Sequence, residues 1–186
     1  TQSGIIIPGK MAIVRDDTNI PLLVMAESYQ PYQNHEMIEL LEGVSNQTGM
    51  EIKRAGLFGD GEKVFIQLKS NDLKLGNDRV EGYLTGINSF DGSTSLAFGP
   101  SNVTISCTNS FFAAFRGLNT KVRHTKNMVI KIDEICRGLE NVVEEEKQMF
   151  NNIVKLSETK VNKDNIDQVL RKLFNIGREV NLKDSE

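Results

Sequence analysis

Residues 50–69 read MEIKRAGLFGDGEKVFIQLK, and this stretch decides the fold of the chain. Its second half, residues 63–69, alternates apolar and polar side chains, as a strand with one buried face does. Phe65 is the only apolar residue on the opposite face of that strand. The Gly-Asp-Gly at 59–61 indicates a tight turn. Residues 50–58 and 63–69 are therefore expected to pair as an antiparallel hairpin.

Three further strands are predicted after this hairpin, over residues 79–88, 95–98 and 103–106. The sequence Phe90-Asp91-Gly92-Ser93 supplies the turn between the first two of them, because Gly tolerates the positive φ that such turns need. Together with the hairpin, these segments predict an antiparallel sheet of about five strands.

A helix is predicted on each side of the sheet segments. The first begins with Asn34 as its N-cap and ends at Gly49, and the second is capped by Thr108 or Asn109 and stops at Gly117. The apolar stripe that supports the first helix consists of Met37, Ile38, Leu40, Leu41 and Val44.

From residue 127 onward the pattern changes to long helices. Apolar residues recur at spacings of three and four from Ile132 to Leu156, with Glu146 breaking the seam, and a second stripe follows Asp164. Two such stripes predict an antiparallel helical hairpin or coiled-coil-like arm, although ordinary core helices explain them equally well.

The expected fold is therefore α+β: a sheet of about five antiparallel strands flanked by helices, followed by a C-terminal helical hairpin. We expect an irregular N-terminal segment at 1–33, with one strand over residues 20–25. An α+β core domain at 34–126 and a helical arm at 127–186 follow.

The composition of the chain indicates the size of its core and the compartment in which it works. With 186 residues, 39% of them hydrophobic, the chain can bury a real core. It contains no apolar run near the roughly 20 residues that cross a bilayer and no signal peptide, so a cytoplasmic protein without a membrane contact is expected. Cys107 and Cys136 are expected to stay thiols. Because the sequence begins with Thr1, we expect it to be a fragment that lacks its native N-terminus.

One segment reverses the sign of the net charge, which is −3 overall. Between Gly92 and Ile132 the sequence has no Asp or Glu. Cations with aromatic side chains beside them are typical of a surface that binds a polyanion. A solvated basic face, balanced by the acidic segment that follows, is the other interpretation. The block contains Arg116, Lys121, Arg123, Lys126, Lys131, His124, Phe111, Phe112 and Phe115.

Two motifs that mark common classes of enzyme are absent from the sequence. The sequence has no Gly-rich loop ending in Gly-Lys-Ser/Thr and no Gly-x-Ser-x-Gly elbow, so no nucleotide-hydrolysing or serine-hydrolase site is expected. A hydrolase built on His124 and Asp91 is the least favoured interpretation, because a turn explains Asp91 better. We expect no cofactor and no metal, since Glu140, Glu144, Glu145 and Glu146 do not point the same way on a helix.

Four segments resemble a known family. Tyr29-Gln30-Pro31-Tyr32-Gln33-Asn34, Asn88-Ser89-Phe90-Asp91-Gly92-Ser93, Pro100 through Asn109, and Arg123-His124-Thr125 are similar, in order and spacing, to motifs of the phage/plasmid-like family known as domain of unknown function 932. Phe90 stands where that family usually has His, and Ser101-Asn102 stand where it has Arg. The resemblance implies a mobile-element origin and no established activity. The expected architecture is also similar to phage single-strand annealing proteins of the RecT, Redβ and Erf type, which assemble into rings or filaments on single-stranded DNA.

The favoured hypothesis is a non-enzymatic protein that binds and anneals single-stranded DNA in a basic groove and forms homo-oligomers through its helical arm. Phe112 is the expected base contact among the aromatic residues, because Phe111 and Phe115 share a face and are expected in the core. Tyr83 is a further candidate for stacking. The alternative is a protein-binding module, a phage factor acting on a host defence protein, that uses the acidic helical arm. The expected phosphate-binding residues are Arg116, Lys121, Arg123, His124 and Lys126, with Lys53, Arg54 and Lys63 on an opposite wall.

Overall fold

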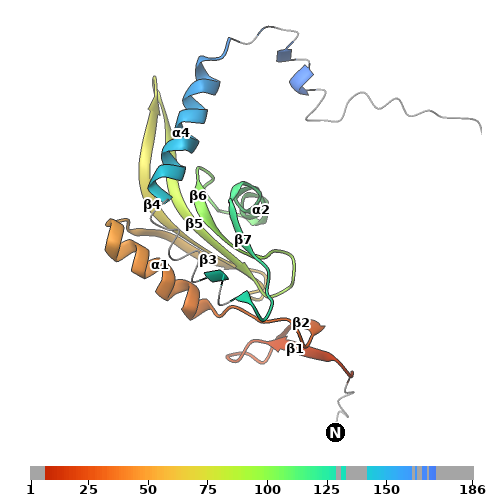
Figure 1. Cartoon of the computed structure of the whole chain (residues 1–186). Helices are drawn as coiled ribbons and strands as arrows, with labels where there is room; N and C mark the ends of the chain where they lie inside the picture. Colours follow the sequence, from red (N-terminus) through yellow and green to blue (C-terminus); the bar gives the residue numbers. More distant parts are fainter. Residues whose placement is uncertain are drawn as a thin grey trace, which may run out of the picture. The chain divides into compact units, whose positions relative to one another are not determined.

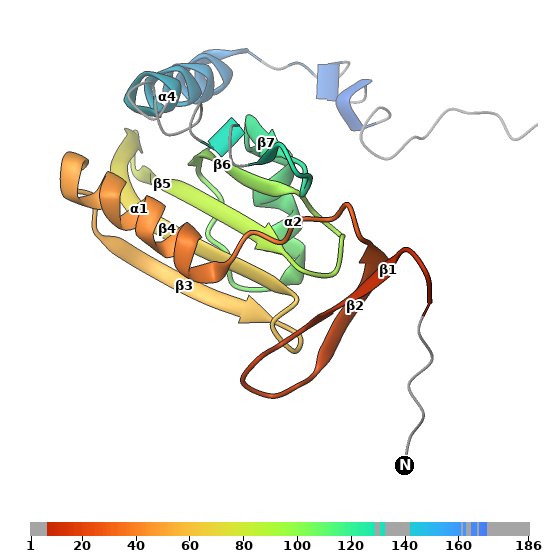
Figure 2. The ribbon, with the colours of Figure 1, turned by 60° about the horizontal axis from the view of Figure 1, so that its bottom comes forward.

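The computed structural model describes residues 7–128, 131–132, 142–160, 162, 165–166 and 168–170. The chain divides into two compact units, Thr1–Asn151 and Asn152–Glu186. The first unit contains the sheet and the helices that pack on it (Figures 1 and 2).

The five-stranded sheet confirms the predicted fold class. Its strands run in the order β3-β4-β5-β6-β7, and every neighbouring pair is antiparallel. The predicted hairpin is present, with Phe58 paired to Lys63 and positive φ at Gly59 and Gly61. The strands are β3 (Ile52–Phe58), β4 (Lys63–Leu75), β5 (Asp78–Ser89), β6 (Leu96–Ser101) and β7 (Thr120–Val122).

Helices cover both faces of this sheet (Figure 2). The helix α1 (Asn34–Thr48) packs its buried residues against Ile66 and Leu68, and α2 (Thr108–Gly117) packs against a cluster that contains Phe65. The alternation along β4 thus sends even-numbered side chains to one core and Phe65 to the other, as the period of a strand requires.

Each helix begins earlier than predicted, α1 by one residue and α2 by one or two. The N-cap of α1 is Gln33, whose backbone N–H donates to Glu36 Oε2 at 2.7 Å, and the helix ends at Gly49 with φ 73°. The N-cap of α2 is Cys107, whose N–H donates to Ser110 Oγ at 3.0 Å. In both helices a side chain three residues into the helix satisfies the orphan donor, which sets the boundary.

Residues 103–106 do not form the predicted strand. Gln67 is fully buried on β4, and its side chain donates to Val103 O at 2.9 Å and accepts from the Ile105 N–H at 3.0 Å. A glutamine amide thus replaces the neighbouring strand as the hydrogen-bonding partner of this segment. The fifth strand is instead β7, which pairs with β6 through Leu96 and Val122.

The N-terminal segment contains a two-stranded hairpin, whereas one strand was expected. The strands β1 (Lys10–Val14) and β2 (Pro21–Ala26) pair antiparallel and form a separate sheet. Most side chains of β1 are exposed, so this strand lacks the alternation that would reveal it in the sequence.

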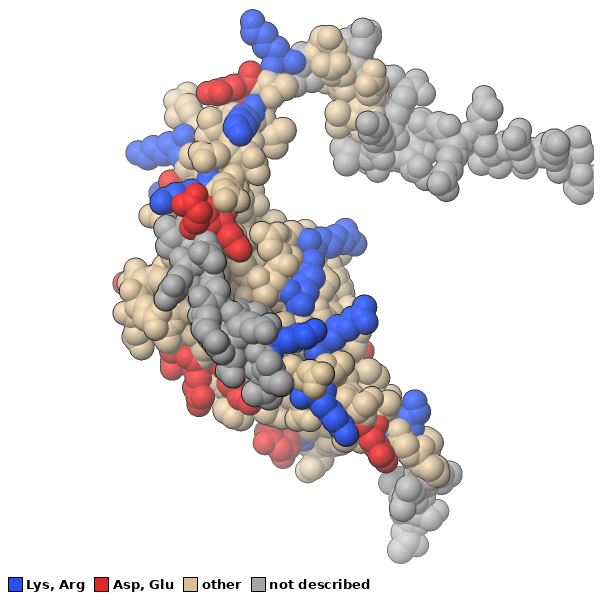
Figure 3. Space-filling view, viewed as in Figure 1, with Lys and Arg blue, Asp and Glu red and all other residues tan. Residues whose placement is uncertain are grey.

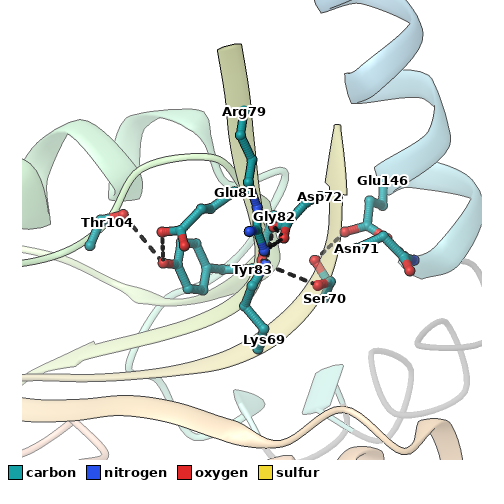
Figure 4. A network of polar contacts seen from close by, with 10 residues as sticks. All are labelled: Lys69, Ser70, Asn71, Asp72, Arg79, Glu81, Gly82, Tyr83, Thr104 and Glu146. Carbon is teal, nitrogen blue, oxygen red and sulfur yellow. Dashed lines mark hydrogen bonds and ion pairs between the residues drawn. The ribbon is translucent and has the colours of Figure 1, made fainter. Parts of the chain in front are cut away.

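Helix α4 (Val142–Glu158) lies within the predicted helical region. The second predicted stripe, from Asp164, falls largely outside the described residues. Glu146, which breaks the apolar seam, is 3% exposed and accepts hydrogen bonds from Ser70 Oγ and Asn71 Nδ2 (Figure 4). These two residues form an irregularity in β4 opposite Gly82. The carboxylate therefore attaches the start of α4 to the sheet.

Candidate nucleic-acid interface

The exposed basic side chains of the acid-free block come from α2, β7 and the turn that follows. Arg116, Lys121, Arg123 and Lys126 are all exposed. In the part of the chain that the structure describes, none of the four forms an ion pair. Figure 3 shows Lys and Arg side chains gathered over α2 and β7. These four residues are called the basic face below.

Strand geometry explains why the basic face and the core share one short segment. Val122 points into the core and is 3% exposed, whereas its neighbours Lys121 and Arg123 are exposed. Lys121 Nζ lies 4.8 Å from the centroid of the Phe115 ring and donates to Arg116 O at 3.2 Å. The strand therefore places Lys121 and Arg123 on the same side as α2.

A cavity of about 620 Å³ opens beside the basic face. It lies between the end of β2, the turn after β5, the last part of α2, and β7. Its wall combines cations, hydroxyl groups and apolar side chains, and we call it the β7 pocket. Among its lining residues are Met25, Tyr29, Ser93, Thr94, Ser95, Phe115, Lys121, Arg123, His124 and Thr125.

His124 lies in the wall of the β7 pocket and not among the exposed cations. The side chain is 7% exposed, and burial lowers the pKa of its imidazole, which is therefore neutral at pH 7. Its ring stacks on Tyr29 at a centroid distance of 5.0 Å, and its backbone oxygen accepts from the Gln30 N–H at 3.2 Å. Neither ring nitrogen forms a hydrogen bond of good geometry, although the backbone of Gln30 approaches the ring and opposes the fall in its pKa. Such buried, unpaired groups cost about 1–3 kcal/mol each.

Tyr29 and Thr94 complete the buried side of the pocket. The Tyr29 hydroxyl donates to Ser89 O at 3.2 Å, and burial, with the nearby Asp91 carboxylate, raises the pKa of Tyr29 to about 12. Thr94 is 6% exposed, and its hydroxyl oxygen also has no partner in the structure. Three unpaired polar atoms, two from His124 and one from Thr94, therefore belong to residues that line a single cavity.

The predicted turn at Asp91-Gly92-Ser93 is confirmed. Gly92 has φ 71°, and Asp91 Oδ1 accepts from the Ser93 N–H at 2.9 Å. The other Asp91 oxygen pairs with Lys63 Nζ. Burial alone would raise the pKa of Asp91, but hydrogen bonds from Lys63 and Ser93 outweigh it and lower the pKa. The Asp91 carboxylate therefore balances the positive charge of Lys63, which is not free to bind a phosphate.

The structure does not bring the expected opposite wall to the basic face. Lys53 and Arg54 are exposed on β3, which forms one edge of the sheet, whereas β7 forms the other. With neighbouring strands about 4.8 Å apart, the two edges are separated by roughly 19 Å of sheet. Lys53 and Arg54 thus lie on a separate surface.

The aromatic residues are arranged differently from the expectation. Phe111 is fully buried as predicted, and half-buried Phe112 meets its ring edge-on at 5.5 Å. Phe115, expected in the core, is partly buried: it packs against the core cluster that contains Phe111 and also lines the β7 pocket under Lys121. Tyr83 is 1% exposed and hydrogen-bonds Glu81 at 2.5 Å, so its ring is closed to a base (Figure 4).

Sequence reasoning missed several pocket residues. In the sequence Tyr29 stands out only as part of a motif-like segment. Thr94 has no pattern around it that indicates a binding site, because a threonine after a turn is common. Ser95 and Met25 reach the pocket through strand ends that come together only in the folded chain. The resemblance of residues 29–34, 88–93 and 123–125 to one family was the available clue, since all three segments meet at this pocket.

The acidic segment offers a smaller surface than its sequence indicates. Glu144 is exposed and Glu145 is half-buried, whereas Glu146 is held by the sheet. Glu140 lies outside the described residues. Within the described ranges, no group of three or more His, Cys, Asp or Glu residues is placed to hold a metal ion. The same ranges include no helix both long and apolar enough to cross a bilayer.

Fold and surface together define a mixed α+β protein with an antiparallel sheet, a basic edge and a pocket beside it. The chain belongs to the family described as Domain of unknown function (DUF932), whose model matches residues 21–185. The match spans all of the motif-like segments noted in the sequence. No curated protein and no solved structure matches the chain.

Proposed function

We propose that this protein binds single-stranded DNA along the basic face and promotes annealing, as a recombination protein of a phage or related mobile element. The observation that carries the proposal is the exposure of Arg116, Lys121, Arg123 and Lys126 along α2, β7 and the turn that follows, without ion pairs in the described residues. Unpaired, hydrated cations can each displace a counterion from a phosphate, which is the main source of affinity in such complexes.

Phe115 favours a single strand over a duplex. Its ring lies beside Lys121 and faces the β7 pocket, where an unpaired base could stack on it. Bases in a duplex are already stacked on each other and cannot reach such a ring. The half-buried Phe112, on the same helix, is a second stacking candidate.

The second unit supplies apolar surface for oligomer formation. Its exposed side chains include Leu156 at 72%, Val169 at 52% and Ile166 at 48%. A second copy of the chain that covers these residues would place several basic faces along one strand, and the sites would then reinforce one another. The alternative proposal, a protein-binding module, would use the acidic side chains of α4, the exposed Glu144 and the half-buried Glu145.

Fluorescence anisotropy of a labelled single-stranded oligonucleotide tests the proposal. The variant Lys121→Glu/Arg123→Glu should lose binding, whereas Lys53→Glu/Arg54→Glu, with the same change in charge at the opposite sheet edge, should bind nearly as the parent does. For four phosphates the affinity should fall by about 2.8 log units per log unit of salt. Equal loss in both double variants would show a non-specific charge effect, and no binding of the parent at low salt would refute the proposal.

A strand-annealing assay follows with the same proteins. Two complementary oligonucleotides, one carrying a fluorophore and the other a quencher, should pair faster in the presence of the parent chain than alone. The basic-face double variant should give the uncatalysed rate. Binding without faster pairing would leave a single-strand binding protein and reject the annealing role.

A further inference from the structure

The wall of the β7 pocket combines polar and apolar side chains. Lys121 and Arg123 bring two positive charges to it, and the residues after β5 bring the hydroxyls of Ser93, Thr94 and Ser95. No Asp or Glu is among the residues that line it in the described part of the chain. A site with this composition fits an anion that accepts several hydrogen bonds.

The apolar part of the wall fits a flat ring. Phe115 and Met25 belong to the same wall as Tyr29, which itself stacks on His124. The cavity of about 620 Å³ falls within the range of roughly 300–1,000 Å³ that small-molecule sites occupy. A cavity whose wall offers contacts for both a ring and an anion fits a nucleotide.

Unpaired buried groups form a second, independent argument for a ligand. His124 is 7% exposed and Thr94 is 6% exposed, so both are more than nine-tenths buried. The hydroxyl of Thr94 has no partner in the structure, and neither nitrogen of His124 forms a hydrogen bond of good geometry. Buried polar groups in folded proteins are nearly always hydrogen-bonded, and an exception calls for an explanation such as a functional role or a bound group that supplies the missing partner.

We propose that the β7 pocket binds one nucleotide through a terminal phosphate monoester. The monoester is favoured over the diester of a strand interior because it carries close to two negative charges, which match Lys121 and Arg123. The Thr94 hydroxyl contributes a further hydrogen bond to the phosphate, and Phe115 stacks on the base. This inference rests on the proposed function where the nucleotide is the end of a bound strand, and stands alone where it is a free mononucleotide.

The experiment compares four probes on the full chain. They are one oligonucleotide sequence with a 5′-phosphate, with a 3′-phosphate and without a terminal phosphate, together with free thymidine 5′-monophosphate measured by calorimetry. We expect at least one phosphorylated strand end to bind about tenfold more tightly than the unphosphorylated strand. Binding of the free nucleotide with no strand preference would identify a mononucleotide site.

Conservative variants inside and outside the pocket localise the effect. Thr94→Val keeps the shape of the side chain and removes its hydroxyl. In this variant the affinity of the preferred phosphorylated strand, divided by that of the unphosphorylated strand, should fall close to one. Thr104→Val, at a threonine that does not line the pocket, should preserve the ratio. Ser95→Ala serves as a second pocket variant if thermal unfolding shows that Thr94→Val does not fold.

The outcomes separate this inference from the proposed function. Strand binding without any terminal-phosphate preference and without nucleotide binding overturns the inference and leaves the basic face intact. Nucleotide binding without strand binding overturns the proposed function and keeps the pocket. A preference that survives both pocket variants also overturns the inference, because the phosphate is then recognised elsewhere.

Discussion

The rings of Tyr29 and His124 stack at a centroid distance of 5.0 Å with an interplanar angle of 30°. This contact joins the segment before α1 to the turn after β7. The backbone reinforces it, because Tyr29 forms an isolated β-bridge with Thr125 and the Gln30 N–H donates to His124 O. Two motif-like segments far apart in the sequence therefore form one structural unit, which closes the buried side of the β7 pocket.

Replacing Tyr29 tests this unit. Tyr29→Ala removes a buried ring and its stack, so the free energy of unfolding should fall by about 3–5 kcal/mol. Tyr29→Phe keeps the ring and loses only the hydrogen bond to Ser89 O, and it should cost about 1 kcal/mol. Urea denaturation followed by circular dichroism measures both. Equal losses in the two variants would mean that the hydroxyl, and not the stack, holds the segment.

His124 should make the stability depend on pH. Burial lowers its pKa in the folded state below the ordinary value of 6.5, so the unfolded chain binds a proton first. The stabilising contribution is complete above pH 6.5 and is lost as the pH falls from there through the lower, folded-state pKa. The free energy of unfolding at pH 5.5 should therefore be smaller than at pH 7.5.

His124→Phe isolates this contribution. A phenyl ring keeps the stack on Tyr29, removes two unpaired nitrogens and cannot titrate, so the drop in stability between pH 7.5 and 5.5 should shrink. His35→Gln, at the other histidine, which is exposed, is the matched control and should keep the parent's drop. An unchanged pH profile in His124→Phe would assign the titration to other groups.

The sequence predicts the sheet and its two covering helices because their signals are local. Alternation in residues 63–69, the Gly59 and Gly61 turn and the stripe around Leu41 each depend on neighbours in the chain. The absence of a strand at 103–106 could not be foreseen in this way. It depends on Gln67, whose buried amide reaches across from β4.

The candidate site was predictable only in part. The cations are visible as a run without acids, and their exposure follows from strand alternation around Val122. Three other features depend on residues distant in sequence. They are the burial of His124, the ion pair between Lys63 and Asp91, and the position of Phe115 in the pocket wall. Charge and composition locate the basic face, whereas the pocket requires the fold.

Gln67 should be essential for the attachment of residues 103–106. Gln67→Leu preserves the approximate volume but leaves Val103 O, the Ile105 N–H and the Thr85 hydroxyl without this partner. Each unpaired buried group costs about 1–3 kcal/mol, so a loss of roughly 3 kcal/mol or more is expected. Gln47→Leu, on the exposed side of α1, should change the free energy of unfolding by less than about 0.5 kcal/mol. Similar stability of both variants would contradict the role of Gln67.

Two glycine substitutions should change the free energy of unfolding in opposite directions. A Cβ at Gly82 would overlap the backbone oxygen of Asn71 and lie 2.6 Å from Ser70 Oγ and 2.8 Å from Glu146 Oε1, so Gly82→Ala should destabilise by about 1–3 kcal/mol and disturb the attachment of α4. At Gly43, within α1, a Cβ would meet nothing within 4 Å. Gly43→Ala should stabilise by about 0.5–1 kcal/mol, as alanine does in a helix. Thermal unfolding of the two variants gives the comparison, and a Gly82→Ala chain as stable as the parent would contradict the tight contact between Gly82 and the Ser70–Asn71 irregularity.

Single neutralisations should divide the salt dependence of DNA binding among the four cations of the basic face. For a single strand each phosphate contact contributes about 0.7 to the slope of log affinity against log salt. Glutamine at Arg116, Lys121, Arg123 or Lys126 should therefore lower the slope by about that amount, whereas Lys53→Gln at the far sheet edge should leave it unchanged. Anisotropy titrations at four salt concentrations give each slope. A cation whose loss lowers affinity without changing the slope would act by positioning the strand, and an unchanged slope in all four variants would move the phosphate contacts to another surface.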